Sequence, residues 1–211
     1  MKLYIYEHCP FCVRARMIFG FKALPFDISV MAEGDAATPV SMVGRKVAPI
    51  LEKDDGTFMP ESMDIVRYVD SLTGTPIVDQ PADSAIAAWC DAVSTPLFQL
   101  AIPRFTRADF AELSTPEARA AYLQREEKAF GSMEALMADT PRLLQDVAEK
   151  LAELEPLIAD RQSVDTSDFL LFPWLRSLTI VKDVAFSPAV TAYMNRISAA
   201  SQVPLLTWQA I

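Results

Sequence analysis

The sequence predicts a two-domain protein in which a small α/β domain is followed by an all-helical one. Five of the six glycines lie in residues 1–74, and only Gly131 lies beyond them. Strand-like and helix-like runs alternate in that first part, whereas helical apolar spacing dominates the rest. We therefore expect an α/β domain at residues 1–74 and an all-α domain at residues 82–211. Residues 75–81 contain two prolines and are expected to form the linker.

The first three elements are predicted to be a strand, a helix and a strand. Residues 3–6 are apolar and aromatic, which suits a buried strand. Residues 10–21 place apolar side chains on one face at helical spacing. Residues 26–30 alternate with a period of two, as a second strand would. This βαβ order requires parallel strands joined by a crossover helix.

The rest of the first domain is predicted to be a short helix, a hairpin and a longer helix. Pro39 is suited to opening a helix that ends at Val43. Strands at residues 49–52 and 57–59 are joined by an Asp-Asp-Gly turn. Ser62 is expected to cap the last helix. The complete order, βαβαββα, is that of a thioredoxin-like domain. The inward face of its last helix is expected to hold Ile65, Val66, Val69 and Leu72.

The second domain is predicted to be entirely helical. Ser114 and Glu117 have the spacing of a capping box, and Asp165 and Asp168 resemble a second cap. Pro173 lies inside an apolar run, where we expect it to kink or delay the helix. Helical runs are expected at residues 86–100, 114–138, 141–154, 169–181 and 188–200.

Composition excludes several classes of protein. The chain has 211 residues, 51% of them hydrophobic, which is typical of a globular fold. Asp and Glu number 28 against 19 Lys and Arg, giving a net charge of −9, so a nucleic-acid partner is not expected. No stretch approaches the roughly 20 apolar residues that span a bilayer. The first residues are too polar for a signal peptide. We expect a soluble, cytoplasmic monomer.

The small number of cysteines and histidines limits the kinds of site that the chain can form. There are three, Cys9, Cys12 and Cys90, with one histidine, His8. These are too few for a secreted disulfide scaffold. A structural zinc site would need all four as ligands, including Cys90 from far along the chain. We therefore expect no metal, a Cys-x-x-Cys pair, and a third cysteine with a buried structural role.

The pair Cys9-Pro10-Phe11-Cys12 lies between a predicted strand and a predicted helix. Pro10 suits the first helical position, so Cys9 would sit at the helix N-terminus with Cys12 one turn on. The free N–H groups and the positive end of the helix dipole stabilise a thiolate. We expect Cys9 to be an exposed nucleophile and Cys12 a sheltered resolving thiol. The alternative is two incidental thiols. His8 either tunes the nucleophile or is a surface imidazole.

Two further segments are candidates for the rest of a site. A cis bond between Ala48 and Pro49 would face the cysteine loop and turn the Ala48 N–H and C=O outward for a peptide ligand. The helix start at Glu61-Ser62 could hold an α-carboxylate, with Glu61 accepting from an α-ammonium. The alternative for these two residues is ordinary capping. Arg45 or Lys46 could meet a second carboxylate or remain solvated.

These motifs identify a resemblance. Cys-Pro-Phe-Cys is similar to the Cys-Pro-Tyr-Cys of glutaredoxins, and the whole chain resembles the two-domain bacterial glutaredoxin 2 family. Two positions depart from the family pattern: Phe11 replaces the usual Tyr and Ala48 a common Val. The resemblance runs through residues 1–6, 8–12, 15–20, 42–44, 49–51, 53–55, 59–66, 171–173 and 175–179.

The resemblance implies a glutathione-transferase-like architecture and glutathione as co-substrate. It implies glutathione-dependent reduction of protein or small-molecule mixed disulfides through a Cys9/Cys12 dithiol. Three alternatives stay open: a glutathione transferase, an iron–sulfur carrier in which Cys9 and glutathione ligate a cluster across a dimer, and a non-catalytic regulatory module. The physiological substrate is not predicted. The residues expected to bind glutathione are Cys9, Pro10, Phe11, Ala48, Pro49, Glu61 and Ser62.

Overall fold

The N-terminal domain is built on a four-stranded mixed sheet. The computed structural model describes all residues 1–211. The strands are β1 (Lys2–Ile5), β2 (Asp27–Val30), β3 (Ile50–Glu52) and β4 (Phe58–Pro60), in the order β2-β1-β3-β4. Strands β1 and β2 are parallel, and the other two pairs are antiparallel. This arrangement confirms the predicted thioredoxin-like order.

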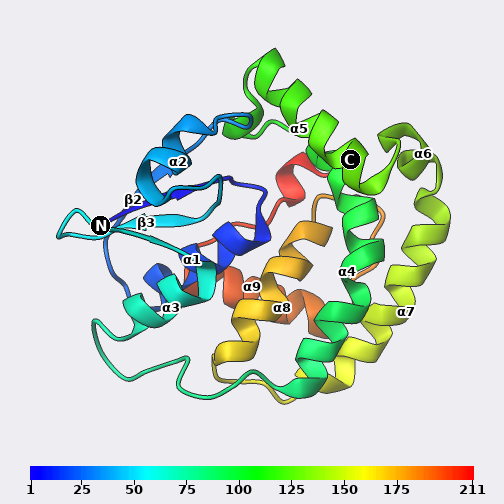
Figure 1. The fold of residues 1–211 in the computed structure, drawn as a ribbon. Helices are drawn as coiled ribbons and strands as arrows, with labels where there is room; N and C mark the ends of the chain where they lie inside the picture. The colour runs from blue at the N-terminus through cyan, green and yellow to red at the C-terminus, as the bar shows by residue number, and fades with distance from the viewer.

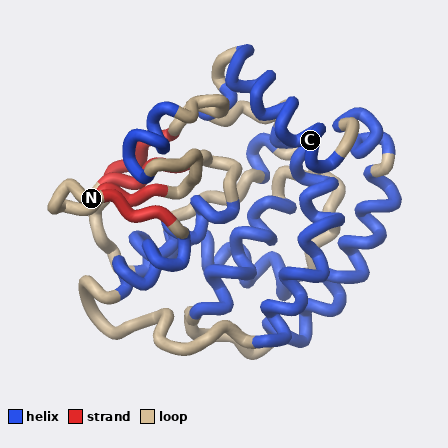
Figure 2. Tube along the Cα trace, in the orientation of Figure 1, coloured by secondary structure: helices blue, strands red, loops and turns tan.

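Helices cover both faces of this sheet. They are α1 (Pro10–Phe21), α2 (Ala37–Val43) and α3 (Ser62–Asp70). Figure 1 shows α1 and α3 side by side below the sheet and α2 above it, and α1 packs against α3. In Figure 2 the strands are confined to one end of the molecule, and a long loop runs from α3 to the helical domain.

The structure corrects three details of the first domain. The N-cap of α3 is Glu61, and Ser62 is the first helical residue, with no side-chain cap at this end. Leu72 lies beyond the helix end at Asp70 and is 45% exposed, so it does not face the core. Helix α2 begins at Ala37, which makes Pro39 its third residue. Each correction is a shift of one or two positions, because several neighbouring residues suit the same helix end.

The C-terminal domain is all helical. Its central helix α4 packs against α7 and α8, and one continuous hydrophobic core runs through both domains. Figure 1 shows this bundle beside the end of α1. The elements are α4 (Ser84–Phe105), η1 (Ala111–Leu113), α5 (Pro116–Phe130), α6 (Met133–Ala138), α7 (Thr140–Ile158), α8 (Thr166–Leu178), α9 (Pro188–Ser201) and η2 (Thr207–Gln209).

The predicted capping box at Ser114 and Glu117 is wrong by one residue. Thr115 is the N-cap of α5, and its side chain accepts a hydrogen bond from the Ala118 N–H. The run expected to continue to residue 138 is divided at Gly131, after which Ser132 caps α6. Glycine and serine are helix-stop and helix-start residues, and together they outweigh the helical composition around them.

The cap predicted at the start of α8 is confirmed. Asp165 accepts from the Ser167 N–H at 2.7 Å, and Asp168 accepts from the Asp165 N–H at 2.8 Å. The helix is not delayed by Pro173, because α8 begins at Thr166 and continues through this residue to Leu178.

Pro173 instead contributes to the contact between the domains. Proline has no N–H, so the carbonyl four residues earlier, that of Phe169, loses its helical donor. Arg14 of α1 replaces it, donating from Nε to the Phe169 oxygen at 3.0 Å. The α1 helix also packs closely on α9, where Gly20 lies against the backbone of Ser201.

The sequence predicts no apolar segment of membrane-spanning length, but helix α4 is such a segment. Its 22 residues are long and apolar enough to cross a bilayer by length and composition alone. In the structure it lies in the middle of the helical bundle, with Ile86, Val93, Leu97 and Leu100 fully buried. A helix that is surrounded by other helices is apolar on several sides, which explains its composition.

Candidate active site

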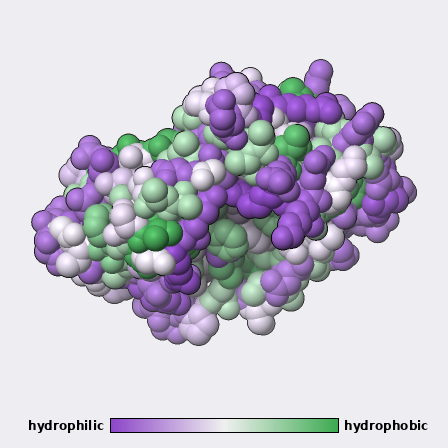
Figure 3. Space-filling view, turned by 45° about the horizontal axis from the view of Figure 1, so that its top comes forward, coloured by the Kyte–Doolittle hydropathy of each residue, from purple (hydrophilic) through white to green (hydrophobic).

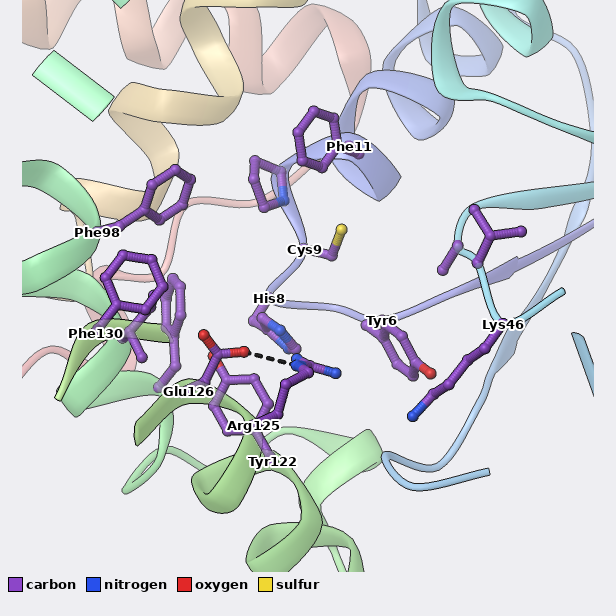
Figure 4. Close-up of a pocket in the computed structure, with 15 residues that line it drawn as sticks. Tyr6, His8, Cys9, Phe11, Lys46, Phe98, Tyr122, Arg125, Glu126 and Phe130 are labelled. Atoms are coloured by element: carbon purple, nitrogen blue, oxygen red, sulfur yellow. Dashed lines mark hydrogen bonds and ion pairs between the residues drawn. The ribbon is translucent and has the colours of Figure 1, made fainter. Parts of the chain in front are cut away.

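Cys9 is the N-cap of α1, and Pro10 is the first residue of the helix, as predicted. The backbone of Cys9 is extended, and its N–H donates to the Tyr6 carbonyl at 3.3 Å. Both cysteines are thiols rather than a disulfide. Cys12 is fully buried, whereas Cys9 is only partly accessible and thus less exposed than the sequence suggested. Figure 4 shows the Cys9 sulfur pointing into an open cavity.

The surroundings of Cys9 favour its thiolate. They lower the pKa of this thiol to about 7, and the largest contribution is a hydrogen bond from the Cys12 thiol. Burial opposes the shift, whereas the charge of His8 and the backbone N–H groups of Cys12 and Phe11 add to it. The helix N-terminus therefore helps, as expected, but the neighbouring thiol helps more.

Cys12 has the opposite character. Burial and its hydrogen bond to Cys9 raise the pKa of the Cys12 thiol well above its usual value. Its sulfur accepts a hydrogen bond from the Tyr6 N–H at 3.4 Å. Two thiols one helical turn apart thus differ in pKa, so that one is ionised near neutral pH while the other keeps its proton.

His8 is buried beside the nucleophile, so its interpretation as a surface imidazole is wrong. It is 6% exposed, and its ring lies among Tyr6, Phe105, Phe110 and Tyr122. Its Nδ1 lies 2.7 Å from Oε1 of Glu112, and its backbone N–H donates to the same oxygen at 3.0 Å.

Glu112 reaches this position from the helical domain. Its side chain is completely buried. Burial opposes ionisation, yet the hydrogen bonds from His8 hold the pKa of this carboxyl below its usual value. The second domain thereby fixes the residue that precedes the nucleophile. No sequence pattern indicated this contact, because Glu112 lies 104 positions away from His8.

The loop before β3 forms the opposite wall of the site. The Ala48–Pro49 peptide bond is cis, as predicted. No hydrogen bond within the chain uses the N–H or C=O of Ala48. Lys46, Val47 and Ala48 line the same cavity as Cys9, whereas Pro49 does not. An unpaired N–H and C=O at this wall can bind an extended peptide as a strand edge does.

The turn at Glu61-Ser62 lies outside that cavity. Glu61 has φ +72°, a left-handed backbone angle that is uncommon for residues other than glycine. Its exposed side chain forms an ion pair with Arg45 at 2.5 Å. Ser62, in contrast, is buried. Arg45 therefore binds a carboxylate of the chain itself, an option that the sequence did not suggest.

The cavity lies between the two domains and has a volume of about 490 Å³. Figure 3 shows the surface hollowed between them, with hydrophobic side chains at the floor and hydrophilic ones around it. Of the predicted site residues, the structure brings Cys9, Pro10, Phe11 and Ala48 together here. The wall from the helical domain was missed, because apolar spacing does not distinguish a cavity wall from a core. This wall consists of Phe98, Ile102, Phe105, Tyr122, Arg125, Glu126 and Phe130.

A charged cluster lies at one edge of this wall. Arg125 of α5 donates from both Nη atoms to buried Glu33 of the first domain, at 2.7 and 2.9 Å. It also donates from Nε to Glu126 at 2.8 Å. Burial opposes the shift, but the two carboxylates raise the pKa of Arg125 further above its usual value. The two-pronged bond between Arg125 and Glu33 joins the domains across the cavity edge.

Cys90 is buried, as predicted, and is 5% exposed. Burial raises the pKa of its thiol to about 12, although nearby Arg14 opposes this. The Cys90 carbonyl accepts a hydrogen bond from the Trp174 indole at 2.9 Å. No group of three or more His, Cys, Asp or Glu side chains is placed to hold a metal ion.

Comparison with known proteins gives consistent matches for both parts of the chain. The family described as "Glutaredoxin 2, C terminal domain" matches residues 85–210. The family described as "Glutathione S-transferase, N-terminal domain" matches residues 3–76. A curated relative named glutaredoxin 2, from Escherichia coli strain K12, is 41% identical over 215 residues, with both chains fully covered.

Solved structures agree with these matches. Glutaredoxin 2 of Salmonella typhimurium, solved in complex with glutathione, superposes with a TM-score of 0.96 at 41% identity. The match covers all of this chain and 98% of that one. A glutathione transferase of Phanerochaete chrysosporium matches with a TM-score of 0.68 at 17% identity, over 94% and 96% of the two chains. The transferase shares the fold, which confirms the predicted glutathione-transferase-like architecture.

Proposed function

The chain belongs to the glutaredoxin 2 family, and from this premise we propose that it reduces disulfides with electrons from glutathione. The observation that carries the proposal is the pair of thiols at the start of α1, where the Cys9 pKa is lowered to about 7 and the Cys12 pKa is raised. Such a pair supplies a nucleophilic thiolate and a protonated partner at neutral pH. The substrates are protein or small-molecule mixed disulfides.

In the first step the Cys9 thiolate attacks the glutathione sulfur of a mixed disulfide. A bond forms between Cys9 Sγ and that sulfur, the original S–S bond breaks, and the other thiol leaves as a thiolate that takes a proton from water. The electron pair of Cys9 thus moves into the new S–S bond. The stable Cys9 thiolate keeps the nucleophile available, and its moderate pKa preserves its reactivity.

Two routes complete the cycle. A glutathione thiolate can attack the glutathione sulfur on Cys9, which forms oxidised glutathione and restores the Cys9 thiolate. Alternatively, Cys12 loses its proton and attacks Cys9 Sγ, releasing glutathione and forming an intramolecular disulfide. Two glutathione molecules then reduce this disulfide. The high pKa of Cys12 favours the first route whenever glutathione is abundant.

We propose that glutathione lies along the wall formed by Cys9, Phe11 and Ala48. The unpaired N–H and C=O of Ala48, beside Pro49, would bind its backbone. The start of α3 at Ser62 would receive the α-carboxylate through free N–H groups, and Glu61 the α-ammonium. The remaining proposed contact is Pro10, which lines the cavity beside the nucleophile. The ion pair between Glu61 and Arg45 implies that Arg45 moves or shares Glu61 with the ligand.

The dithiol separates this function from glutathione conjugation, the leading alternative. A transferase needs one group that activates glutathione, and a second thiol hydrogen-bonded to the first adds nothing to that chemistry. Conjugation of an aromatic electrophile would nevertheless detect a transferase. A glutathione-ligated iron–sulfur carrier would be coloured after anaerobic purification. We further propose a cytoplasmic monomer with domain boundaries at residues 1–74 and 82–211, joined by residues 75–81.

A mass spectrum tests the proposed chemistry. Treatment of the reduced protein with oxidised glutathione is expected to add one glutathione, located on Cys9 by peptide mapping under acid conditions. The Cys12→Ser variant should accumulate this adduct, because the resolving thiol is absent. Cys90 should remain unmodified, since it is buried and protonated. An adduct on Cys90 or Cys12 with Cys9 left free would contradict the proposal.

A further inference from the structure

The cavity beside Cys9 has two chemically different sides. Figure 4 shows Lys46 on one side of Cys9, and Phe98, Phe130 and Glu126 on the other. The first side comes from the α/β domain and carries a cation and the unpaired backbone of Ala48. The second side comes from the helical domain and is aromatic, with the carboxylate of Glu126 and the guanidinium of Arg125 at its edge. A mixed disulfide also has two parts, and only one of them is glutathione.

The carboxylate of Glu126 is incompletely paired. The residue is 8% exposed and lines the cavity. Its Oε1 accepts from Arg125 Nε at 2.8 Å, and no side chain or backbone group of the chain donates to its Oε2. The two Nη atoms of Arg125 are already bound to Glu33. This cluster has two carboxylates and one guanidinium, so it leaves one net negative charge at the cavity edge.

Aromatic rings surround the open space next to this charge. The ring centroids of Phe98 and Phe130 lie 6.4 Å apart, and Phe98 also packs edge-on against Trp174 at 5.3 Å. The faces of aromatic rings attract cations, and a buried carboxylate attracts them more strongly than an exposed one.

We propose that this aromatic side, with Glu126, binds the non-glutathione part of the substrate and selects mixed disulfides whose leaving thiol carries an ammonium or guanidinium group. The inference rests on the proposed function. In the reaction the Cys9 thiolate attacks the glutathione sulfur, the S–S bond breaks, and the cationic thiol departs as its thiolate from the aromatic side. Glu126 touches the substrate but takes no part in electron transfer.

The test compares two substrates of equal length. They are the glutathione mixed disulfides of cysteamine, which has an ammonium group, and of 2-mercaptoethanol, which has a hydroxyl in its place. The two leaving thiols differ intrinsically, so the informative quantity is the change in their kcat/KM ratio on mutation. Glu126→Gln keeps the shape and removes the charge. Glu127→Gln is the matched control, because Glu127 is the next residue of α5 and is exposed.

In the expected result, Glu126→Gln lowers the preference for the cysteamine substrate about fivefold, which is in the range of a partly desolvated cation contact. Glu127→Gln leaves the ratio unchanged. An equal loss on both substrates, or a raised KM for reduced glutathione, would show that Glu126 serves glutathione or the fold, and would overturn the inference. An unchanged ratio would also overturn it.

Two further measurements distinguish a misfolded variant, and a failure of the proposed function, from the absence of a role for Glu126. If Glu126→Gln does not fold by circular dichroism, the salt dependence of the wild-type ratio decides. A preference for cysteamine that falls as salt rises supports the charged contact, and a ratio independent of salt rejects it. If the wild-type protein reduces neither substrate, the proposed function itself fails, which is distinct from reduction of both without a contribution from Glu126.

Discussion

Replacing Cys9 with serine is expected to abolish the reduction of glutathione mixed disulfides. A serine hydroxyl stays protonated at neutral pH and does not exchange with sulfur, so the first step of the cycle has no nucleophile. We expect kcat/KM to fall at least about a thousandfold, in the range found when the nucleophile of a covalent mechanism is removed. A coupled assay with glutathione reductase and NADPH measures this loss.

Cys12→Ser is the matched control for this experiment. The variant retains the route in which glutathione attacks the Cys9 adduct, so a substantial part of the activity on small mixed disulfides should remain. Cys12→Ala, which has no donor in place of the thiol that contributes most to the low pKa of Cys9, should in addition shift the activity to higher pH. Full activity without Cys9, or complete loss without Cys12, would contradict the proposed roles.

Gly20→Ala is expected to destabilise the protein, although replacing a glycine inside a helix normally increases stability. Alanine in the interior of a helix usually stabilises by roughly 0.5–1 kcal/mol. At Gly20, however, a Cβ atom would overlap the backbone carbonyl of Ser201 at the end of α9. A backbone cannot rotate away as a flexible side chain does. To avoid this overlap, helix α1, which carries both cysteines, would have to move away from the helical domain.

We expect the free energy of unfolding to fall by about 1–3 kcal/mol or more, which is the usual cost of overpacking a tight contact. Urea denaturation of the wild type and the variant measures the change, with the midpoint compared at constant slope. The direction of the change in the free energy of unfolding decides the test. A variant more stable than the wild type would show that α1 and α9 do not approach each other as closely as the structure indicates.

Local patterns predicted the elements and the redox loop well. The helix from Pro10 to Phe21 has the predicted limits, since a proline at its first position and an apolar face specify it without help from distant residues. The turn at Gly56, with φ +79°, joins β3 and β4 as the Asp-Gly pair indicated. Asp165 caps α8 for a similar reason. These features depend on neighbours within about four positions.

Features that depend on tertiary contacts could not be predicted. Helix α8 accommodates Pro173 because Arg14, 155 positions from Phe169, supplies the missing donor. His8 is buried because Glu112 of the other domain binds it. The charged cluster of Arg125, Glu33 and Glu126 likewise forms only when the two domains pack against each other. A sequence shows that these residues are polar, but which partner each one binds follows from the docking of the two domains.

The pH titration of Cys9 shows directly whether this thiol is ionised at neutral pH. The rate of alkylation by iodoacetamide at Cys9, followed by mass spectrometry of that peptide, reports the fraction of thiolate at each pH. Because its surroundings lower its pKa, the rate should rise through neutral pH with an apparent pKa of about 7 and level off above it. A rate still climbing through pH 8.5, as for an ordinary free cysteine, would contradict the account.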